Sequence, residues 1–224
     1  MTTIDNFELI ASHMSFESAD EFYFVQILIR SKDGHKANGN NKNRLLKFYT
    51  IRSVAELMAR RDDIIALCHT FNARAYIHPT KRSFKAVGKV MLKEIVENMT
   101  SEQYEPMKRA YPTACGKSFI KSDKKYVIDI DDNPAMTNYA AMEVTNSIMN
   151  YINKECEPLD QYKVEYEVPT AHGRHLITRA FNVDKFKERF PEIVVQKNNP
   201  TLLYYEVQEQ TSETPSENKE LGNI

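Results

Sequence analysis

The sequence predicts an α+β protein in which helices pack on a mixed sheet. Predicted strands and helices follow one another irregularly, without the regular strand–helix–strand alternation of a parallel α/β domain. The chain has 224 residues, of which 42% are hydrophobic and 27% charged, which suffices for a sizeable core. Residues 208–224 have almost no apolar side chains, which predicts a disordered acidic tail. We therefore expect one domain over residues 1–207, followed by this tail.

The first predicted elements form a hairpin and a helix. Residues 21–30 and 45–51 are rich in the aromatic and β-branched side chains that favour strands. The polar segment 31–43 between them is either a solvated loop or a flexible basic finger that contacts phosphate. A helix is expected to begin at Ser53, which starts a Ser-x-x-Glu capping box. Apolar residues at helical spacing then continue to about Phe71.

The remaining elements alternate between both types. Runs of β-branched and aromatic residues predict strands, and apolar residues three and four apart predict helices. In chain order we expect a strand at 73–78, a helix at 83–98, a helix and loop over 101–120, an acidic strand within 124–132, a helix at 138–156, strands at 162–168 and 174–180, a helix at 183–190, and strands at 192–196 and 202–207.

Charge and cysteine content narrow the class of protein. The net charge is −1, so the molecule as a whole is not a basic nucleic-acid binder, although a local basic patch is compatible with it. Three widely spaced cysteines without a CxxC pair argue against a zinc knuckle or a disulfide framework and fit the cytoplasm. The first residues lack signal-peptide features, and no apolar run is long enough to span a membrane. We expect a cytoplasmic protein without a membrane partner.

Two aspartates at the end of a predicted strand are the strongest functional signal. Asp129 and Asp131 are two residues apart, so on a strand they point to the same face. Two carboxylates so close are costly unless a cation neutralises them or one keeps its proton, and such hard ligands suit Mg²⁺ or Mn²⁺. Enzymes that transfer phosphoryl or nucleotidyl groups use such pairs. The alternative is turn chemistry, because aspartates also stabilise turns at strand ends.

A second candidate segment surrounds a glycine turn that precedes another predicted strand. Gly173 lets the backbone approach a ligand closely. Arg174 can hold phosphate with its planar fork, and His175 can donate a hydrogen bond to a phosphate oxygen. His172 and His175 form an alternative metal pair, but a spacing of three places them on opposite faces of a strand.

The third candidate segment, residues 78–83, has the sequence His-Pro-Thr-Lys-Arg-Ser between a predicted strand and a predicted helix. Ser83 is a plausible N-cap, and a helix N-terminus beside Lys81 and Arg82 favours an anion. A solvated basic turn is the alternative interpretation.

These three segments, in this order, resemble the archaeo-eukaryotic primase superfamily, especially the primase-polymerases of phages and plasmids. An N-P-R-like segment comes first in that family and corresponds to 78–82 here. A hydrophobic strand that ends in DxD follows, here 127–131, and then a small-residue turn that ends in histidine before a strand, here 170–176. The resemblance covers roughly residues 73–207, and it implies a primase-polymerase-like fold with an RRM-like catalytic half.

The resemblance implies a template-dependent nucleotidyltransferase that uses divalent metal and serves DNA replication. Asp129 and Asp131 would be catalytic and would bind Mg²⁺ or Mn²⁺. The family carries one more acid on a later strand, but residues 193–196 contain none, and Glu192 is the substitute at the start of that strand. Without a third carboxylate, two-metal chemistry is weakened.

The resemblance also implies which groups bind the nucleotide and which partners the protein has. The nucleotide-binding residues would be His175, Arg174, Arg82 and Thr170. The implied partners are nucleoside triphosphates and single-stranded nucleic acid, with a replicative helicase as a further candidate.

Three alternatives remain open. One is a phosphohydrolase with an aspartate nucleophile, but Asn133 stands where the DxDx[TV] motif of such enzymes has Thr or Val. Another is a catalytically degenerate primase-like domain that binds nucleic acid, nucleotide or a replication partner, which the missing acid favours. The last is a structural or interaction protein.

Overall fold

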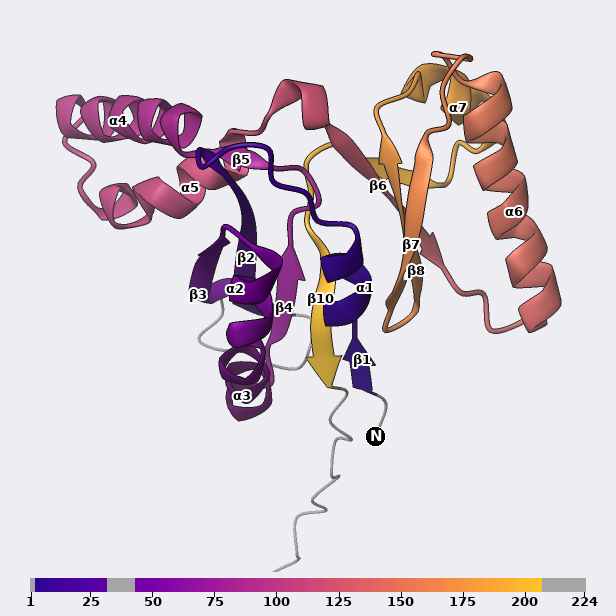
Figure 1. The fold of residues 1–224 in the computed structure, drawn as a ribbon, viewed down its shortest axis with the longest axis horizontal. Coiled ribbons are helices and arrows are strands. Elements are labelled where there is room, and N and C mark those ends of the chain that lie inside the picture. The colour runs from indigo at the N-terminus through magenta and orange to yellow at the C-terminus, as the bar shows by residue number, and fades with distance from the viewer. Residues whose placement is uncertain (1–2, 32–42, 207–224) are drawn as a thin grey trace, which may run out of the picture.

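Two antiparallel sheets, each with its own helices, make up the computed structural model of the protein (Figure 1). The structure describes residues 3–31 and 43–206. The predicted tail at 208–224 and nearly all of the predicted loop at 31–43 lie outside the described residues. The α+β class is confirmed. The expected mixed sheet is wrong, because every strand pairing in the described part of the chain is antiparallel.

The first sheet has the order β1-β10-β4-β2-β3, with the short β5 paired to β2. It brings together the two ends of the described chain, since β1 pairs with β10 (Figure 1). Its strands are β1 (Thr3–Asp5), β2 (Glu21–Ile29), β3 (Arg44–Ile51), β4 (Arg74–Ile77), β5 (Arg82–Ser83) and β10 (Thr201–Glu206).

One face of the first sheet packs against three helices, which are α1 (Phe7–Ser12), α2 (Val54–Ala59) and α3 (Arg61–Phe71). Val25 and Ile27 of β2 point to this face and join the main core cluster. The single helix expected from Ser53 is interrupted at Arg60, although the Ser53 hydroxyl caps α2 as predicted by accepting a hydrogen bond from the Glu56 N–H at 3.0 Å.

The opposite face of the first sheet is covered by helices at one end only. Phe22 and Phe24, near the start of β2, pack against α4 (Phe84–Thr100) and α5 (Ala110–Lys117). Further along the same face of β2, Gln26 and Leu28 line a cavity instead. The helix pair lies beside one end of the sheet (Figure 1). Two 3-10 helices, Glu105–Arg109 and Lys121–Asp123, complete the connection to the second sheet.

The second sheet has the order β7-β8-β6-β9. Ile128 and Leu176 on one face pack against two helices, whereas Val127 and Ile177 on the other face join the core cluster of the first sheet. Because strand residues alternate between faces, Asp129 and His175 point toward the first sheet. The elements are β6 (Lys125–Asp131), α6 (Asn138–Glu155), β7 (Val164–Thr170), β8 (Gly173–Arg179), α7 (Val183–Arg189) and β9 (Val194–Gln196).

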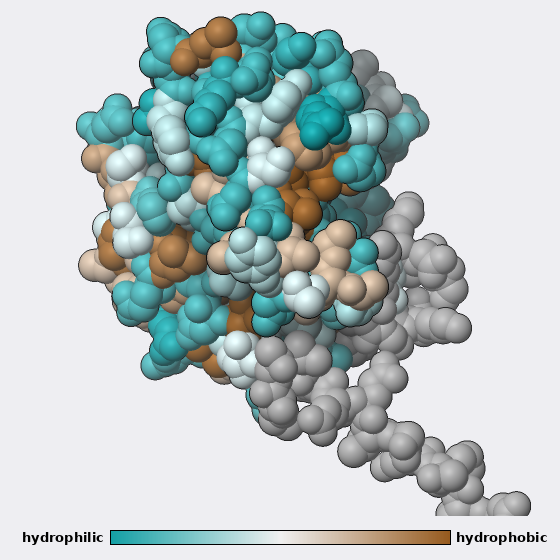
Figure 2. All heavy atoms as spheres, turned by 90° about the vertical axis from the view of Figure 1, so that its right-hand side faces the viewer, coloured by the Kyte–Doolittle hydropathy of each residue, from teal (hydrophilic) through white to brown (hydrophobic). Residues whose placement is uncertain are grey.

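Most predicted elements are therefore confirmed, with boundaries shifted by a few residues. The pair β1 and α1 was missed, because three strand residues and six helical residues are too short to establish a period. The outer face on the α6 side is mostly hydrophilic with separate hydrophobic groups (Figure 2). Met142 and Val144 of α6 are exposed. Cys68, Cys115 and Cys156 are buried free thiols. No helix within the described ranges is long and apolar enough to cross a membrane.

Candidate functional site

A cavity of about 690 Å³ lies between the two sheets. The second sheet contributes the two predicted acids Asp129 and Asp131, together with the predicted nucleotide-binding residues Thr170 and His175. The first sheet and the adjoining segments contribute mainly polar groups. These are Gln26, Arg30, Asn43, Arg74 and Tyr76. The cavity thus gathers acids, bases and amides from strands that are far apart in the sequence.

Asp129 and His175 face each other across the β6–β8 pairing. The His175 Nε2 atom lies 3.3 Å from the Asp129 Oδ1 atom, with side-chain exposures of 12% and 32%. The hydrogen bond from His175 is the largest influence on the Asp129 carboxyl and lowers its pKa, while partial burial acts in the opposite direction. The charge of Arg30 on the first sheet lowers this pKa further. Asp129 is therefore held as a carboxylate at the cavity.

Asp131 pairs with a strand position that only glycine fits. Gly173 pairs with Asp131 and has a φ of 153°, in the region that disfavours side chains. A Cβ atom at this position would lie 2.1 Å from the Ile130 carbonyl oxygen. The missing side chain lets β8 approach the end of β6, so that Thr170 and Asp131 both line the cavity. The close approach at Gly173 is therefore to the backbone of β6, where the sequence predicted an approach to a ligand.

Two arginines of the first sheet reach the cavity, and sequence reasoning missed both. Arg30 follows β2 and its Nη1 donates to the Tyr76 hydroxyl at 3.4 Å. Arg74 starts β4, is only 7% exposed, and stacks over the Tyr205 ring at 3.9 Å from its centroid. The only signal in the sequence was a basic residue at the end of one predicted strand and at the start of another. Arg30 and Arg74 line the same cavity because β2 pairs with β4 in antiparallel fashion.

The residues that could hold a metal ion in this cavity are Asp129 and Asp131. Within residues 3–31 and 43–206, no group of three or more His, Cys, Asp or Glu side chains could hold a metal ion. On β9, Val194 pairs with Asp129, so an apolar residue stands where a third acid would meet the pair. Glu192 is exposed, precedes β9 and does not line the cavity. Two carboxylates on one strand face still suit one hard divalent cation, with the Gln196 amide nearby in the lining.

Arg174 points away from the cavity, contrary to the expectation that it binds nucleotide with His175. Its guanidinium lies 3.2 Å from Asp132 and 3.2 Å from Glu167, on the other face of the second sheet. Neighbouring strand residues point to opposite faces, so His175 in the cavity requires Arg174 outside it.

Arg82 is fully buried and does not line the cavity either. Its guanidinium lies 2.8 Å from the His78 Nδ1 atom and donates to the Thr80 and Cys115 carbonyls at 2.5 and 2.9 Å. It also donates to the Asn198 amide oxygen at 3.0 Å. Burial lowers the Arg82 pKa to about 10, and burial beside this cation lowers the pKa of His78. The segment 78–83 is thus a buried polar core and not an anion site.

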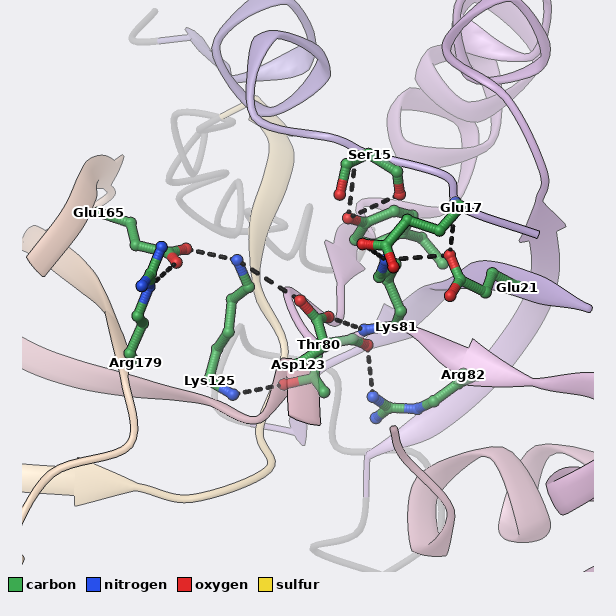
Figure 3. Close-up of polar contacts among 11 residues, drawn as sticks. Ser15, Glu17, Glu21, Thr80, Lys81, Arg82, Asp123, Lys125, Glu165 and Arg179 are labelled. Carbon is green, nitrogen blue, oxygen red and sulfur yellow. Dashed lines mark hydrogen bonds and ion pairs between the residues drawn. The ribbon is translucent and has the colours of Figure 1, made fainter. Parts of the chain in front are cut away.

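The residues around Arg82 instead join the two sheets (Figure 3). The Lys81 side chain is 3% exposed, and its ammonium lies 2.9 Å from Glu21 and 3.2 Å from Glu17. The backbone N–H of Lys81 donates to the Asp123 carboxylate at 2.7 Å. On the side of the second sheet, Lys125 pairs with Glu165, which also binds Arg179 at 3.2 Å. The Lys125 N–H donates to the Thr80 hydroxyl at 2.9 Å, which connects both groups.

Comparisons with protein-family models, with curated proteins and with solved structures find no match for this chain. The fold and the site are therefore the basis for a functional proposal.

Proposed function

We propose that this protein is a template-dependent nucleotidyltransferase of primase-polymerase type that uses Mg²⁺ or Mn²⁺. The observation that carries the proposal is the composition of one cavity, in which Asp129, Asp131 and His175 face Arg30 and Arg74. Paired carboxylates and paired cationic groups in one cavity match a metal-bound triphosphate, which offers positive and negative charge side by side.

Asp129 and Asp131 would hold the cation, since both are oxygen donors on the same strand face. When bound, a divalent cation neutralises phosphate charge and makes a 3′-hydroxyl a better nucleophile. The ionised state of Asp129, secured by the hydrogen bond from His175, is the state that a metal ligand requires.

The basic groups would hold the phosphates. His175 can present an N–H to a phosphate oxygen, and the Thr170 hydroxyl lines the same cavity. Arg30 and Arg74 take the role that we first expected of Arg82 and Arg174, because they reach the cavity from the opposite sheet. Catalysis at such a site depends mainly on positioning and on neutralisation of charge, which these fixed side chains provide.

The second candidate is a primase-like domain that binds nucleotide or nucleic acid without turnover. The observation in its favour is Val194, which pairs with Asp129 on β9 where a further acid would complete a metal cluster. Such a domain would bind a replication partner or single-stranded nucleic acid through the same cavity.

Primer extension distinguishes these candidates. Wild type and the double variant Asp129→Asn/Asp131→Asn are incubated with a primed single-stranded template, labelled deoxynucleotides and Mn²⁺. Asp132→Asn is the matched control, because Asp132 is the adjacent acid but pairs with Arg174 outside the cavity. We expect extension by wild type and the control only. Nucleotide binding without extension by any variant would favour the second candidate, and extension by the double variant would overturn the proposed site.

A further inference from the structure

A continuous chain of polar contacts connects the cavity to the interior of the first sheet. Asp129 contacts Nε2 of His175 at 3.3 Å, and Nδ1 of the same ring lies 2.9 Å from the Thr201 hydroxyl. Thr201 is the first residue of β10 and is fully buried. Asp129 and His175 belong to the second sheet, so the Thr201 contact exists only because the two sheets are docked.

The two contacts of the imidazole favour one placement of its proton. A carboxylate only accepts hydrogen bonds, so hydrogen on the His175 Nε2 atom, 3.3 Å from the Asp129 Oδ1 atom, is the arrangement that suits this contact. In a neutral ring, Nδ1 then has a free lone pair, which accepts the Thr201 O–H. The same hydroxyl can accept from Nδ1–H if the ring becomes charged, so Thr201 satisfies Nδ1 in both states. A flip of the ring would place carbon atoms against both partners and lose both hydrogen bonds.

The order carboxylate, imidazole, hydroxyl is that of a nucleophile triad, but the burial excludes this use. In a triad the hydroxyl faces the substrate and the carboxylate is buried. Here the Thr201 side chain is fully buried, and Asp129, 32% exposed, is the end that lines the cavity. The hydroxyl therefore acts on the histidine and not on a substrate.

We infer that Thr201 is a positioning residue that holds the His175 ring with Nε2–H toward the cavity, where this one donor serves Asp129 and a nucleotide phosphate in turn. The inference rests on the proposed function for the identity of the ligand. With a cation on Asp129, the Nε2–H would be free of the carboxylate and would keep its direction, because Thr201 would still hold Nδ1. The donor is then aimed into the cavity without any reorganisation of the ring.

The test uses four substitutions in the full chain, alone and in combination. Thr201→Val removes the hydroxyl at nearly constant shape, and Thr201→Ser restores it. Thr178→Val is the matched control, since Thr178 is also fully buried but its hydroxyl has no hydrogen-bond partner. Affinity for dATP with Mg²⁺ is measured by calorimetry in the wild-type background and with His175→Ala. We expect Thr201→Val to weaken binding about tenfold, the change that corresponds to one hydrogen bond, and the other two variants to bind as wild type does.

The His175→Ala background separates positioning from packing. If Thr201 acts through His175, Thr201→Val has no further effect once the imidazole is absent. The same loss of affinity in both backgrounds would show that Thr201 only supports packing and would overturn the inference, as would unchanged affinity in Thr201→Val alone.

A nitrogen-15 spectrum of the histidine rings tests the proton assignment without nucleotide. In a spectrum recorded at about pH 8.5, we expect hydrogen on Nε2 and a hydrogen-bonded lone pair on Nδ1 of His175. The Nδ1 signal should move toward that of an unbonded lone pair in Thr201→Val but not in Thr201→Ser. Hydrogen on Nδ1 in wild type would overturn the inference. If wild type binds no dATP, the proposed function fails, and the spectrum alone decides the role of Thr201.

Discussion

Replacement of Arg82 tests whether this buried residue stabilises the fold or binds a ligand. Replacement by Met keeps much of the buried volume but removes every donor. Four acceptors then lose their partner, namely His78 Nδ1, the Thr80 and Cys115 carbonyl oxygens, and Asn198 Oδ1. A buried polar group left unpaired costs about 1–3 kcal/mol.

The expected cost of Arg82→Met is below the sum of these terms. The variant no longer buries a guanidinium, which recovers part of the desolvation penalty. We therefore expect a loss of about 3 kcal/mol in the free energy of unfolding, a large part of the stability of a typical domain.

Urea unfolding followed by circular dichroism measures this loss, with an unchanged m-value as the sign that both end states are comparable. Lys85→Met, on the exposed side of α4, is the matched control and should change stability by less than about 0.5 kcal/mol. A stability loss below about 1 kcal/mol for Arg82→Met, together with reduced nucleotide affinity, would refute the structural role and return Arg82 to the binding site.

Three further predictions follow from single contacts. Gly173→Ala should lower the free energy of unfolding by about 2–4 kcal/mol, because its Cβ would meet the Ile130 carbonyl at 2.1 Å; wild-type urea stability would contradict this. The Asp129 pKa lies below its usual 3.8, so this carboxylate adds stability above pH 3.8 that is lost as the pH falls through the lower folded pKa. Asp129→Asn should therefore flatten the acid side of a plot of unfolding free energy against pH. Parallel plots for wild type and variant would disprove the effect. Burial raises the pKa of Asp123, so its protonated form stabilises the fold at low pH, and this contribution is lost as the pH rises through the folded pKa. Asp123→Asn keeps an acceptor for the Lys81 N–H and should leave the melting temperature at pH 7 unchanged or raise it. A clearly lower melting temperature would refute the direction of the Asp123 contribution.

Local sequence patterns predicted most helices and strands correctly, and they predicted which residues of one strand share a face. The period of two placed Asp129 and Asp131 on one face, and both line the cavity. The same period places the neighbouring residues Arg174 and His175 on opposite faces of the strand. The family resemblance nevertheless implied that both bind the nucleotide. The Ser53 capping box predicted the start of α2 correctly, because a cap depends only on residues within one turn.

Relations between strands could not be obtained in this way. A single sequence does not show which strands pair, so it gave no reason to expect two antiparallel sheets in place of one mixed sheet. Arg82 was expected to bind an anion because it stands beside Lys81 near a helix start, but its partners at Cys115 and Asn198 lie 33 and 116 residues away. Proximity of that kind is decided by packing and leaves no local trace.

The sequence by itself thus determined the α+β class, the positions of most elements and the two carboxylates on one strand face, because short-range sterics and alternation fix these properties. Only the tertiary structure decided which cationic groups face the carboxylates. Docking of the two sheets brings Arg30 and Arg74 to the cavity and sets Thr201 against His175. The physical reason is that a site between two sheets consists of long-range contacts, and their free energy belongs to the assembled core and not to any single segment.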